Sequence, residues 1–360
     1  MQTDLFTPFQ MGPYTLANRI IMAPLTRNRA GAGNVPQPLN VEYYRQRATA
    51  GLIITEGAQI ADDALGYPAT PGIHSAEQIA GWKQVTEAVH SRGGRIFIQL
   101  WHCGRISHPS MLPGNALPVA PSAIQPEGQA FTYQGLQSYV TPRALALADI
   151  PHVIQQYRTA AKNALEAGFD GVEIHAANGY LLDQFIRDGS NQRTDSYGGT
   201  AENRCRLLVE VTQAVSEVWG AQRVGVRLSP LNPFNDMHDS NPQHTFDTAA
   251  TLLSPFGLAY LHVMETAIGD NKHPKQSFNF EQLHHAFKGT YMANGGYDKP
   301  RANAAIAAGQ ADLVAFGVAF LANPDLPARF ATNAALNTPD QNTFYGGDTK
   351  GYTDYPLLPA

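Results

Sequence analysis

Eight short apolar runs, separated by segments with helical periodicity, are the feature that most constrains how this chain folds. Each run is bounded by Gly or polar turn residues, which is typical of a buried strand. Strands that alternate with helices predict a parallel sheet, and eight such units predict a closed barrel rather than an open doubly wound sheet. We expect strands at residues 19–22, 51–58, 95–100, 172–174, 223–228, 258–263, 289–293 and 313–316.

The segments between these runs carry apolar residues at helical spacing. Ser75, for example, precedes a segment in which Ile79, Trp82, Val85 and Val89 share one face. The fold class we predict is therefore α/β, as a single (β/α)8 TIM barrel. We expect an N-terminal β-hairpin cap, a lid-like excursion after the third strand at residues 102–149, and a C-terminal tail packed on the barrel at 337–360. The expected helices cover residues 39–49, 75–92, 151–165, 201–219, 246–253, 280–287 and 299–308.

Composition limits the classes of partner. The length of 360 residues suits one barrel, since α/β barrels run from about 200 to over 400 residues. A net charge of -5, without a run of Lys or Arg, argues against nucleic acid and membrane surfaces and favours a small-molecule partner. We expect a cytoplasmic protein, because no targeting segment begins the chain. The two cysteines, Cys103 and Cys205, are too few for a disulfide framework or a zinc site, so we expect no metal.

Chemically active side chains concentrate in residues 171–180. His175, Asn178 and Tyr180 leave the end of the fourth predicted strand, where a loop begins. An imidazole and a carboxamide can both donate hydrogen bonds to one oxygen, and a phenol keeps its proton at neutral pH and can deliver it as a general acid. This equipment suits the protonation of an activated carbonyl compound. The alternative is that His175 is a satisfied core histidine and Tyr180 ordinary packing.

Polar or unusual residues also follow the other strands. Because the carboxyl ends of parallel strands meet at one rim of a barrel, we expect these residues to face one site. After the seventh and eighth strands come Gly295-Gly296 and Phe316-Gly317, where barrels commonly bind phosphate through backbone N–H groups. Each glycine turn alone needs no ligand, but together with the rim they favour a phosphorylated cofactor. The other rim residues are Thr26, Ala58, Gln99, Trp101, His175, Asn178, Tyr180 and Arg227.

Four stretches carry a resemblance to a known family: residues 18–27, 98–105, 168–185 and 322–326. On these stretches the chain resembles the old yellow enzyme family of FMN-dependent ene-reductases, over nearly its whole length. The resemblance implies one FMN-binding TIM-barrel domain over residues 1–360, with FMN across the barrel mouth. It implies cofactor-binding roles for Pro24, Leu25, Thr26, Ala58, Gln99, Arg227, Gly295, Gly296, Phe316, Gly317 and Val318.

The resemblance also implies the substrate site. Tyr180, His175 and Asn178 would be catalytic, and the expected substrate-binding residues are Tyr67, Trp101, His175, Asn178, Asn235 and Tyr345. The residues alone leave other roles open. Tyr67, Trp101 and Tyr345 could equally be packing residues. Thr26 could cap the segment after its strand, and Arg227 could form a surface ion pair. One position departs from the family pattern: many relatives have Arg directly after Gly317 to bind the FMN phosphate, and this chain has Val318.

The implied activity has two halves. NADPH or NADH reduces bound FMN, and hydride then passes from flavin N5 to the β-carbon of an α,β-unsaturated carbonyl or nitro compound, such as an enone, enal or maleimide. His175 and Asn178 would hold the substrate oxygen, and Tyr180 would protonate the α-carbon. The chain would act as a monomer or homodimer. Two alternatives stay open. One is a barrel lyase or aldolase for phosphorylated substrates, although no lysine of this chain follows a strand at the rim. The other is a catalytically silent flavin-binding or sensor protein.

Overall fold

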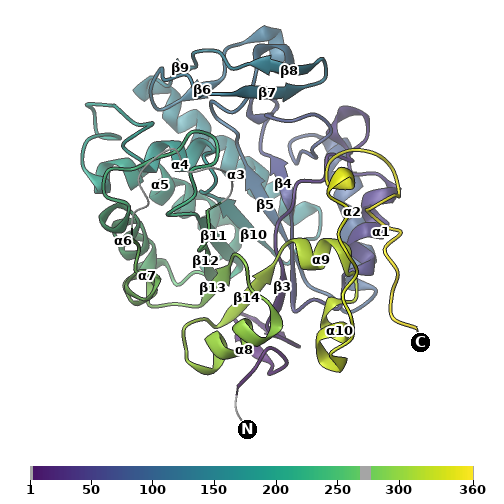
Figure 1. Cartoon of the computed structure of the whole chain (residues 1–360). Coiled ribbons are helices and arrows are strands. Elements are labelled where there is room, and N and C mark those ends of the chain that lie inside the picture. Colours follow the sequence, from purple (N-terminus) through teal and green to yellow (C-terminus); the bar gives the residue numbers. More distant parts are fainter. Residues whose placement is uncertain (1–2, 268–276, 360) are drawn as a thin grey trace.

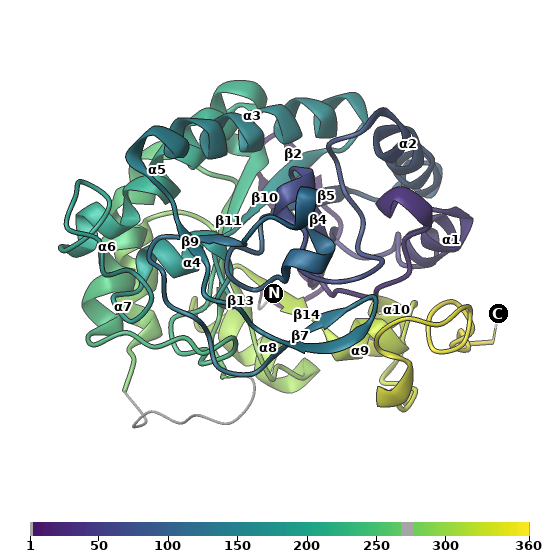
Figure 2. The same cartoon turned by 90° about the horizontal axis from the view of Figure 1, so that it is seen from above.

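The computed structural model of the chain describes residues 3–267 and 277–359. Across these residues, eight parallel strands close into a barrel in the order β10-β11-β12-β13-β14-β3-β4-β5, and helices surround it (Figures 1 and 2). The predicted fold class is confirmed. The barrel strands are β3 (Ile20–Met22), β4 (Leu52–Gln59), β5 (Ile96–Trp101), β10 (Gly171–His175), β11 (Val224–Leu228), β12 (Tyr260–Met264), β13 (Tyr291–Asn294) and β14 (Leu313–Phe316).

Burial explains the apolar runs. Every residue of the eight barrel strands is buried, because side chains point either into the barrel or against the helices. The register places strand ends side by side at one rim: His175 pairs with Arg227, and Met264 pairs with Asn294. Polar residues that end neighbouring strands therefore face the same space.

The helices begin largely at residues whose side chains cap them. Ser75 caps α2 by accepting a hydrogen bond from the backbone N–H of Gln78, whose side chain bonds back to Ser75. Thr200 and Asp298 cap α5 and α8 in the same way, each accepting from a backbone N–H three residues on. The outer helices are α1 (Pro38–Gln46), α2 (Ala76–His90), α3 (Ile150–Glu166), α5 (Ala201–Trp219), α6 (Pro242–Leu253), α7 (Phe280–Phe287) and α8 (Lys299–Ala307).

Some predicted boundaries were wrong. β12 and β13 each begin two residues later than predicted, since a turn at Gly257 and the residues 289–290 precede them. The helix predicted at 39–49 ends at Gln46, and the one predicted at 246–253 begins at Pro242. Three helices were not anticipated, because five to seven residues are too few to show a helical period. They are α4 (Leu181–Ile186), α9 (Val318–Ala322) and α10 (Leu326–Thr332).

Two additions close the barrel at its opposite ends. The hairpin of β1 (Phe9–Met11) and β2 (Tyr14–Leu16) buries Met11 and Leu16 against the side chains of Phe97 and Tyr260, at the end where the strands begin. The excursion after β5 lies at the other end (Figure 1). It contains β6 (Val119–Ala120), β7 (Gln129–Thr132), β8 (Gly135–Ser138) and β9 (Arg143–Ala144), of which β7 and β8 form an antiparallel hairpin.

The C-terminal segment passes the barrel mouth and then runs past α1 to the C-terminus (Figure 1). The ring of Tyr352 stacks on Tyr43 of α1 with centroids 4.1 Å apart, and Arg27 donates to the backbone oxygens of Phe344 and Gly351. Both cysteines are buried and unpaired. None of the helices in the described part of the chain has the length and apolar character needed to cross a membrane.

Candidate active site

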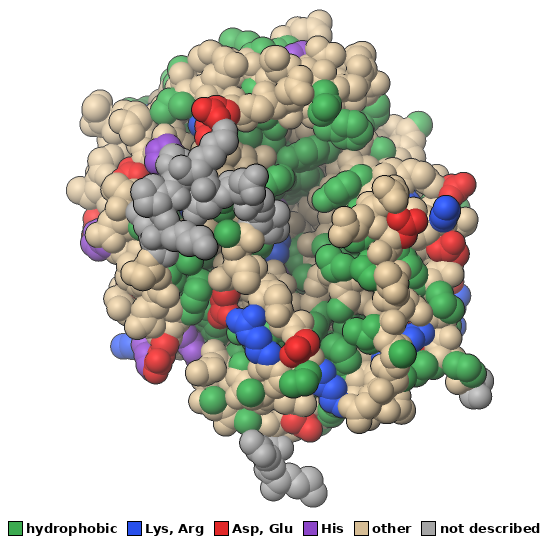
Figure 3. Space-filling model, in the orientation of Figure 1, with side chains coloured by type: hydrophobic (Ala, Val, Ile, Leu, Met, Phe, Trp, Pro, Cys, Tyr) green, Lys and Arg blue, Asp and Glu red, His purple; other side chains and the backbone are tan. Residues whose placement is uncertain are grey.

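A cavity of about 790 Å³ opens at the carboxyl ends of the barrel strands. Figure 3 shows it as a hollow in the middle of the molecule whose walls are largely apolar. Its size falls within the range of ligand and cofactor pockets, about 300–1,000 Å³. The structure brings sixteen of the predicted site residues to this one cavity: Pro24, Leu25, Thr26, Tyr67, Gln99, Trp101, His175, Asn178, Tyr180, Arg227, Gly295, Gly296, Phe316, Gly317, Val318 and Tyr345.

Two predicted residues do not line the cavity. Ala58 is fully buried in the main hydrophobic core, and its neighbour Gly57 lines the cavity instead. The pairing of β4 with β5 shifts between Ile54 and Gly57, and this irregularity decides which residue of β4 faces the site. Asn235 does not line the cavity either, whereas its neighbour Phe234 does. Ala58 and Asn235 are therefore corrections to the predicted lining.

His175 is electrically neutral in the folded protein. Burial holds the pKa of His175 well below its ordinary value, and the neighbouring Arg227 and His262 lower it further. The ring lies between aromatic neighbours, with centroids 6.2 Å from Trp101 and 5.1 Å from Tyr180. Its Nδ1 is buried and has no hydrogen-bond partner among the described residues. A neutral imidazole carries one N–H donor, so His175 can donate to a ligand without bringing a charge.

Tyr180 keeps its proton. Burial raises the pKa of Tyr180, and its hydroxyl donates to the hydroxyl of Tyr67 at 3.2 Å. Tyr67 in turn stacks on Trp101 with centroids 5.7 Å apart. The pair of phenols thus forms a short hydrogen-bonded chain at the cavity wall, with Tyr180 next to His175.

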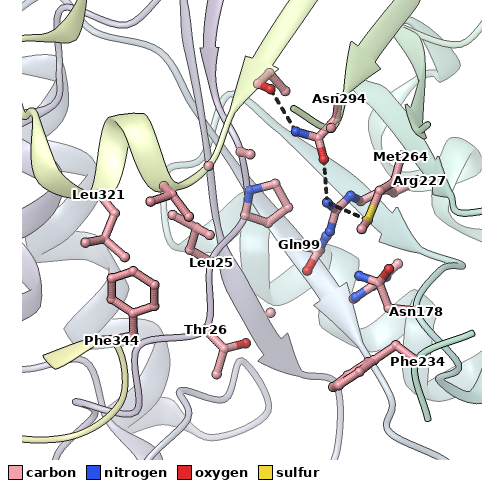
Figure 4. A pocket seen from close by; sticks show the side chains of 18 of the residues that line it. Leu25, Thr26, Gln99, Asn178, Arg227, Phe234, Met264, Asn294, Leu321 and Phe344 are labelled. Carbon is pink, nitrogen blue, oxygen red and sulfur yellow. Dashed lines mark hydrogen bonds between the residues drawn. The ribbon is translucent and has the colours of Figure 1, made fainter. Parts of the chain in front are cut away.

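Asn178 has an unusual backbone that the surrounding chain holds in place. Its φ of 59° lies in the left-handed region, which Asn adopts more readily than most residues. Its backbone N–H donates to Ser229 Oγ at 2.7 Å, and its carbonyl accepts from Asn235 Nδ2 at 2.8 Å. Asn235 therefore contributes to the site by supporting Asn178. Figure 4 shows the side chain of Asn178 beside those of Gln99 and Arg227.

Arg227 supplies a buried positive charge at the end of β11. Its Nη2 donates to Asn294 Oδ1 at 3.0 Å and lies 4.0 Å from Met264 Sδ, while Asn294 Nδ2 donates to the backbone oxygen of Ala315 (Figure 4). The Nε of Arg227 has no partner among the described residues. Sequence reasoning missed Asn294 and Met264, although each is the last residue of its strand and so shares the rim with Arg227.

A buried acid lies beneath Gln99. Gln99 Nε2 donates to Glu173 Oε1 at 2.7 Å, and His262 Nδ1 contacts Glu173 Oε2 at 2.8 Å. Burial favours the neutral acid, but His262, Arg227 and Gln99 outweigh it and lower the pKa of Glu173. Since its N–H group is engaged with an ionised carboxylate, Gln99 has its carbonyl oxygen left to accept a hydrogen bond from a ligand.

Glycine turns after β13 and β14 form another part of the cavity wall. Gly295 and Gly296 have φ of 113° and 66°, and a Cβ at Gly295 would lie 2.5 Å from Thr266 Oγ1, so only glycine fits there. Val318, 46% exposed, begins α9 beside Gly317 and offers no charge. The guanidinium of Arg301 donates to the backbone oxygens of Gly295 and Gly296, at 3.3 and 3.2 Å. Arg301 is therefore a cation within reach of this wall.

A closed eight-stranded barrel with a cavity at the carboxyl ends of its strands defines the class as a TIM-barrel enzyme. Comparison with known proteins identifies the family. The family described as NADH:flavin oxidoreductase / NADH oxidase matches residues 4–337, and the chain belongs to it as an FMN-dependent oxidoreductase of the old yellow enzyme type. The predicted family is confirmed.

Relatives cover nearly the whole chain. It is similar to putative 12-oxophytodienoate reductase 11 of Oryza sativa subsp. japonica, with 46% identity over 99% of this chain and 98% of the relative. Among solved structures it is similar to morphinone reductase, with a TM-score of 0.94, 48% identity, and 99% and 97% of the two chains covered. The old yellow enzyme homologue from Zymomonas mobilis has a TM-score of 0.95 and 45% identity, with 99% and 100% covered.

The residues present fit FMN. The flavin ring has one edge of carbonyl oxygens flanking an N–H, and the cavity offers a complementary edge: the unpaired Nε of Arg227 and the open carbonyl oxygen of Gln99 lie near one another (Figure 4). Pro24 and Leu25 add apolar surface to the cavity wall. The glycine turns after β13 and β14 present backbone that a phosphate can approach closely. The binding elements thus occupy one continuous cavity.

Proposed function

We propose that this protein is an FMN-dependent ene-reductase that uses NADPH or NADH to reduce the activated C=C bond of an α,β-unsaturated carbonyl or nitro compound. When bound, FMN accepts a hydride from the nicotinamide and supplies one to the substrate. The observation that carries the proposal is the convergence of three neutral donors, His175, Asn178 and Tyr180, in an apolar cavity beside Arg227 and Gln99.

His175 and Asn178 have the role of binding the electron-withdrawing oxygen of the substrate. Negative charge grows on that oxygen as hydride reaches the β-carbon, and two fixed N–H donors on buried elements of the site stabilise it. Because His175 is neutral, its N–H makes an ordinary hydrogen bond to the uncharged oxygen, and this bond strengthens as charge develops. Asn178 contributes its amide for the same reason.

Tyr180 has the role of general acid. It retains its proton in the free site and lies against His175, so its hydroxyl is next to the place where the substrate oxygen binds. The proton passes to the α-carbon when the O–H of Tyr180 turns from Tyr67 toward the substrate, and the hydroxyl of Tyr67 can then donate to the Tyr180 oxygen instead. Arg227 acts at the cofactor, where its positive charge favours negative charge on the adjacent ring edge.

The walls and the relatives support an apolar substrate. Phe131, Phe234 and Tyr345 line the cavity and are 46%, 40% and 67% exposed, so the mouth presents aromatic surface to an incoming molecule. The similar proteins include 12-oxophytodienoate reductases and morphinone reductase, whose names describe reductases of organic compounds. We propose enones, enals, maleimides and nitroalkenes as the classes to test.

The test begins with the absorption spectrum of the purified protein, before and after addition of FMN, where the visible bands of oxidised flavin are expected. Anaerobic addition of NADPH or NADH should bleach these bands, and 2-cyclohexenone should restore them. Bleaching without restoration by any enone, maleimide or nitroalkene would contradict ene reduction and leave the flavin-binding alternative. A protein that takes up no flavin would contradict the proposal as a whole.

A further inference from the structure

We infer that Asn232 is a positioning residue, which turns the carboxamide of Asn178 so that its NH₂ group faces the substrate oxygen. Asn232 lies in the loop after β11, is completely buried, and does not line the cavity. Its action is therefore on Asn178 rather than on any ligand. The inference rests on the proposed function, in which Asn178 binds that oxygen.

Orientation matters for a carboxamide more than for most donors. One end of the group is a hydrogen-bond donor and the other an acceptor, and rotation by half a turn exchanges them with almost no change of shape. If Asn178 presented its oxygen to the substrate oxygen, two acceptors would face one another. Hydrogen bonding by its neighbours decides which end points into the cavity.

A relay of hydrogen bonds makes this decision. The backbone N–H of Phe234 donates to Asn232 Oδ1 at 3.3 Å, and Asn232 Nδ2 donates to Asn178 Oδ1 at 2.8 Å. A backbone N–H can only donate, so it assigns the oxygen of Asn232 to one side and its NH₂ group to the other. That NH₂ group occupies the oxygen of Asn178 and leaves Asn178 Nδ2 to donate into the cavity.

The rest of Asn178 is already held. Ser229 Oγ accepts from its backbone N–H at 2.7 Å, and Asn235 Nδ2 donates to its carbonyl at 2.8 Å. The side-chain amide is thus the remaining degree of freedom, and Asn232 contacts it directly. Since Asn232 and Asn178 lie 54 positions apart, the relay depends on the loop after β11 packing against the loop after β10.

The decisive variant is Asn232→Asp. It has nearly the same shape and keeps the acceptor for the Phe234 N–H, but it replaces the donor toward Asn178 with a carboxylate oxygen. Asn178 must then turn its NH₂ group toward Asp at 232 and its oxygen toward the ligand. The dissociation constant of 4-chlorophenol, measured from the flavin spectrum of the FMN-loaded protein, should rise about 10- to 100-fold, since a donor to a charged oxygen is lost.

Asn232→Ala is the matched control. It removes the donor without imposing the wrong orientation, so a ligand can select the correct one of two states at a cost of about 2-fold in affinity. If Asn232 instead served only to fill buried space, Asn232→Ala would weaken 4-chlorophenol binding at least as much as Asn232→Asp. Much weaker binding of 4-chlorophenol by Asn232→Asp than by Asn232→Ala supports a positioning role for Asn232. The reverse order overturns that role. FMN binding should be the same in all variants.

A double-mutant cycle completes the test. If Asn232 acts only through Asn178, then Asn178→Ala and Asn178→Ala with Asn232→Asp should bind 4-chlorophenol equally. A further loss in the double variant overturns the inference. Should Asn232→Asp fail to retain FMN, the cycle is run with Asn232→Ala, and again no further loss over Asn178→Ala is expected.

The cycle separates the two levels of the argument. Wild-type affinity in Asn178→Ala would remove Asn178 from the proposed oxygen site, and the inference would fall with it. Wild-type affinity in Asn232→Asp, beside weakened binding in Asn178→Ala, would overturn the role of Asn232 alone and leave the proposed function standing.

Discussion

At the scale of single residues, water exclusion governs the chemistry that the cavity can perform. Burial is the largest influence on the pKa of both His175 and Tyr180, lowering one and raising the other, so both side chains are neutral over the ordinary pH range. Arg227 retains its charge because a guanidinium stays protonated even when buried. The site therefore combines neutral hydrogen-bond donors with the fixed positive charge of Arg227.

Tyr180→Phe isolates the proton donor. The reoxidation of reduced flavin by 2-cyclohexenone should slow by about 10²- to 10⁴-fold, because the α-carbon loses its positioned acid. Reduction of the flavin by NADPH or NADH needs no such proton and should stay nearly unchanged. Stopped-flow absorption at the flavin bands measures both steps.

The control for this variant is Tyr67→Phe, which removes the hydrogen-bond partner of Tyr180 and leaves the acid itself. Its effect on reoxidation should be much smaller. If Tyr180→Phe reoxidises at the wild-type rate, the proton comes from elsewhere.

At the scale of secondary-structure elements, the irregular pairing of β4 with β5 shapes the cavity. Gly57 follows the shift in register and lies under the indole ring of Trp101. A Cβ at Gly57 would approach Trp101 Cε3 to 2.6 Å, closer than atoms tolerate. Trp101 also packs against Tyr67 and Tyr180, so displacing it disturbs the substrate wall.

Gly57→Ala should therefore destabilise the protein by about 1–3 kcal/mol, the usual cost of overpacking, and weaken phenol binding. Chemical denaturation and titration of the flavin spectrum measure the two effects. Gly31→Ala is a suitable control, because its Cβ would meet no atom closer than 3.4 Å and its φ of -74° suits alanine. Equal behaviour of the two variants would mean that Trp101 yields without cost.

The start of α9 carries the departure from the family pattern. Val318→Arg should tighten FMN binding about 10- to 100-fold, because a guanidinium makes charge-assisted hydrogen bonds to phosphate and Val makes none. The gain should be smaller if Arg301 already turns to the phosphate. Lys299 is directed elsewhere, since its Nζ donates to Phe330 O and Asn333 Oδ1.

Riboflavin, which lacks the phosphate, provides the control for Val318→Arg. Recovery of flavin fluorescence on dilution gives the dissociation constant of each flavin. The variant should bind FMN more tightly and riboflavin as before. An equal change for both flavins would place position 318 away from the phosphate.

At the scale of the whole molecule, buried titratable groups couple stability to pH in opposite senses. Burial lowers the pKa of His102 to about 4 and also lowers that of His175, so between pH 6.5 and 4 the unfolded chain binds protons there that the folded chain does not. These histidines make stability fall as pH drops below 6.5. Burial raises the pKa of Glu56 to about 7, so its contribution to stability is present below pH 4.5 and lost as pH rises to 7.

His102→Asn tests the histidine contribution, because Asn retains an acceptor for the Gly104 N–H that bonds His102 Nδ1 and has no group that titrates. Between pH 7.5 and 5, the wild-type protein should lose about 2 kcal/mol more unfolding free energy than the variant, at about 1.4 kcal/mol per pH unit below 6.5. Urea denaturation at the two pH values measures the difference.

Glu56→Gln should change the dependence of stability on pH in the opposite direction, since it removes a group that favours the folded state at lower pH.

If the unfolding free energies of the wild type and of His102→Asn change with pH in the same way, the lowered pKa of His102 is contradicted.

The amino-acid sequence by itself determined the barrel and the place of the site. Parallel strands that are buried on both faces are apolar along most of their length, and this leaves eight recognisable runs in the sequence. The carboxyl ends of these strands share one rim of the barrel. This rule alone brings His175, Asn178, Tyr180, Gln99 and Arg227 to one site. The same local signals do not extend to short elements, which is why α4, α9 and α10 were missed.

Tertiary structure alone decided which atoms meet. Gly57 rather than Ala58 faces the cavity because of a pairing irregularity between two strands, which no local pattern in β4 reveals. The contact of Asn232 with Asn178 joins loops from different barrel units, and the neutral state of His175 follows from surroundings contributed by many segments. Hydrogen-bond partners and burial are properties of chain segments brought together by folding, so they appear only when the barrel has closed.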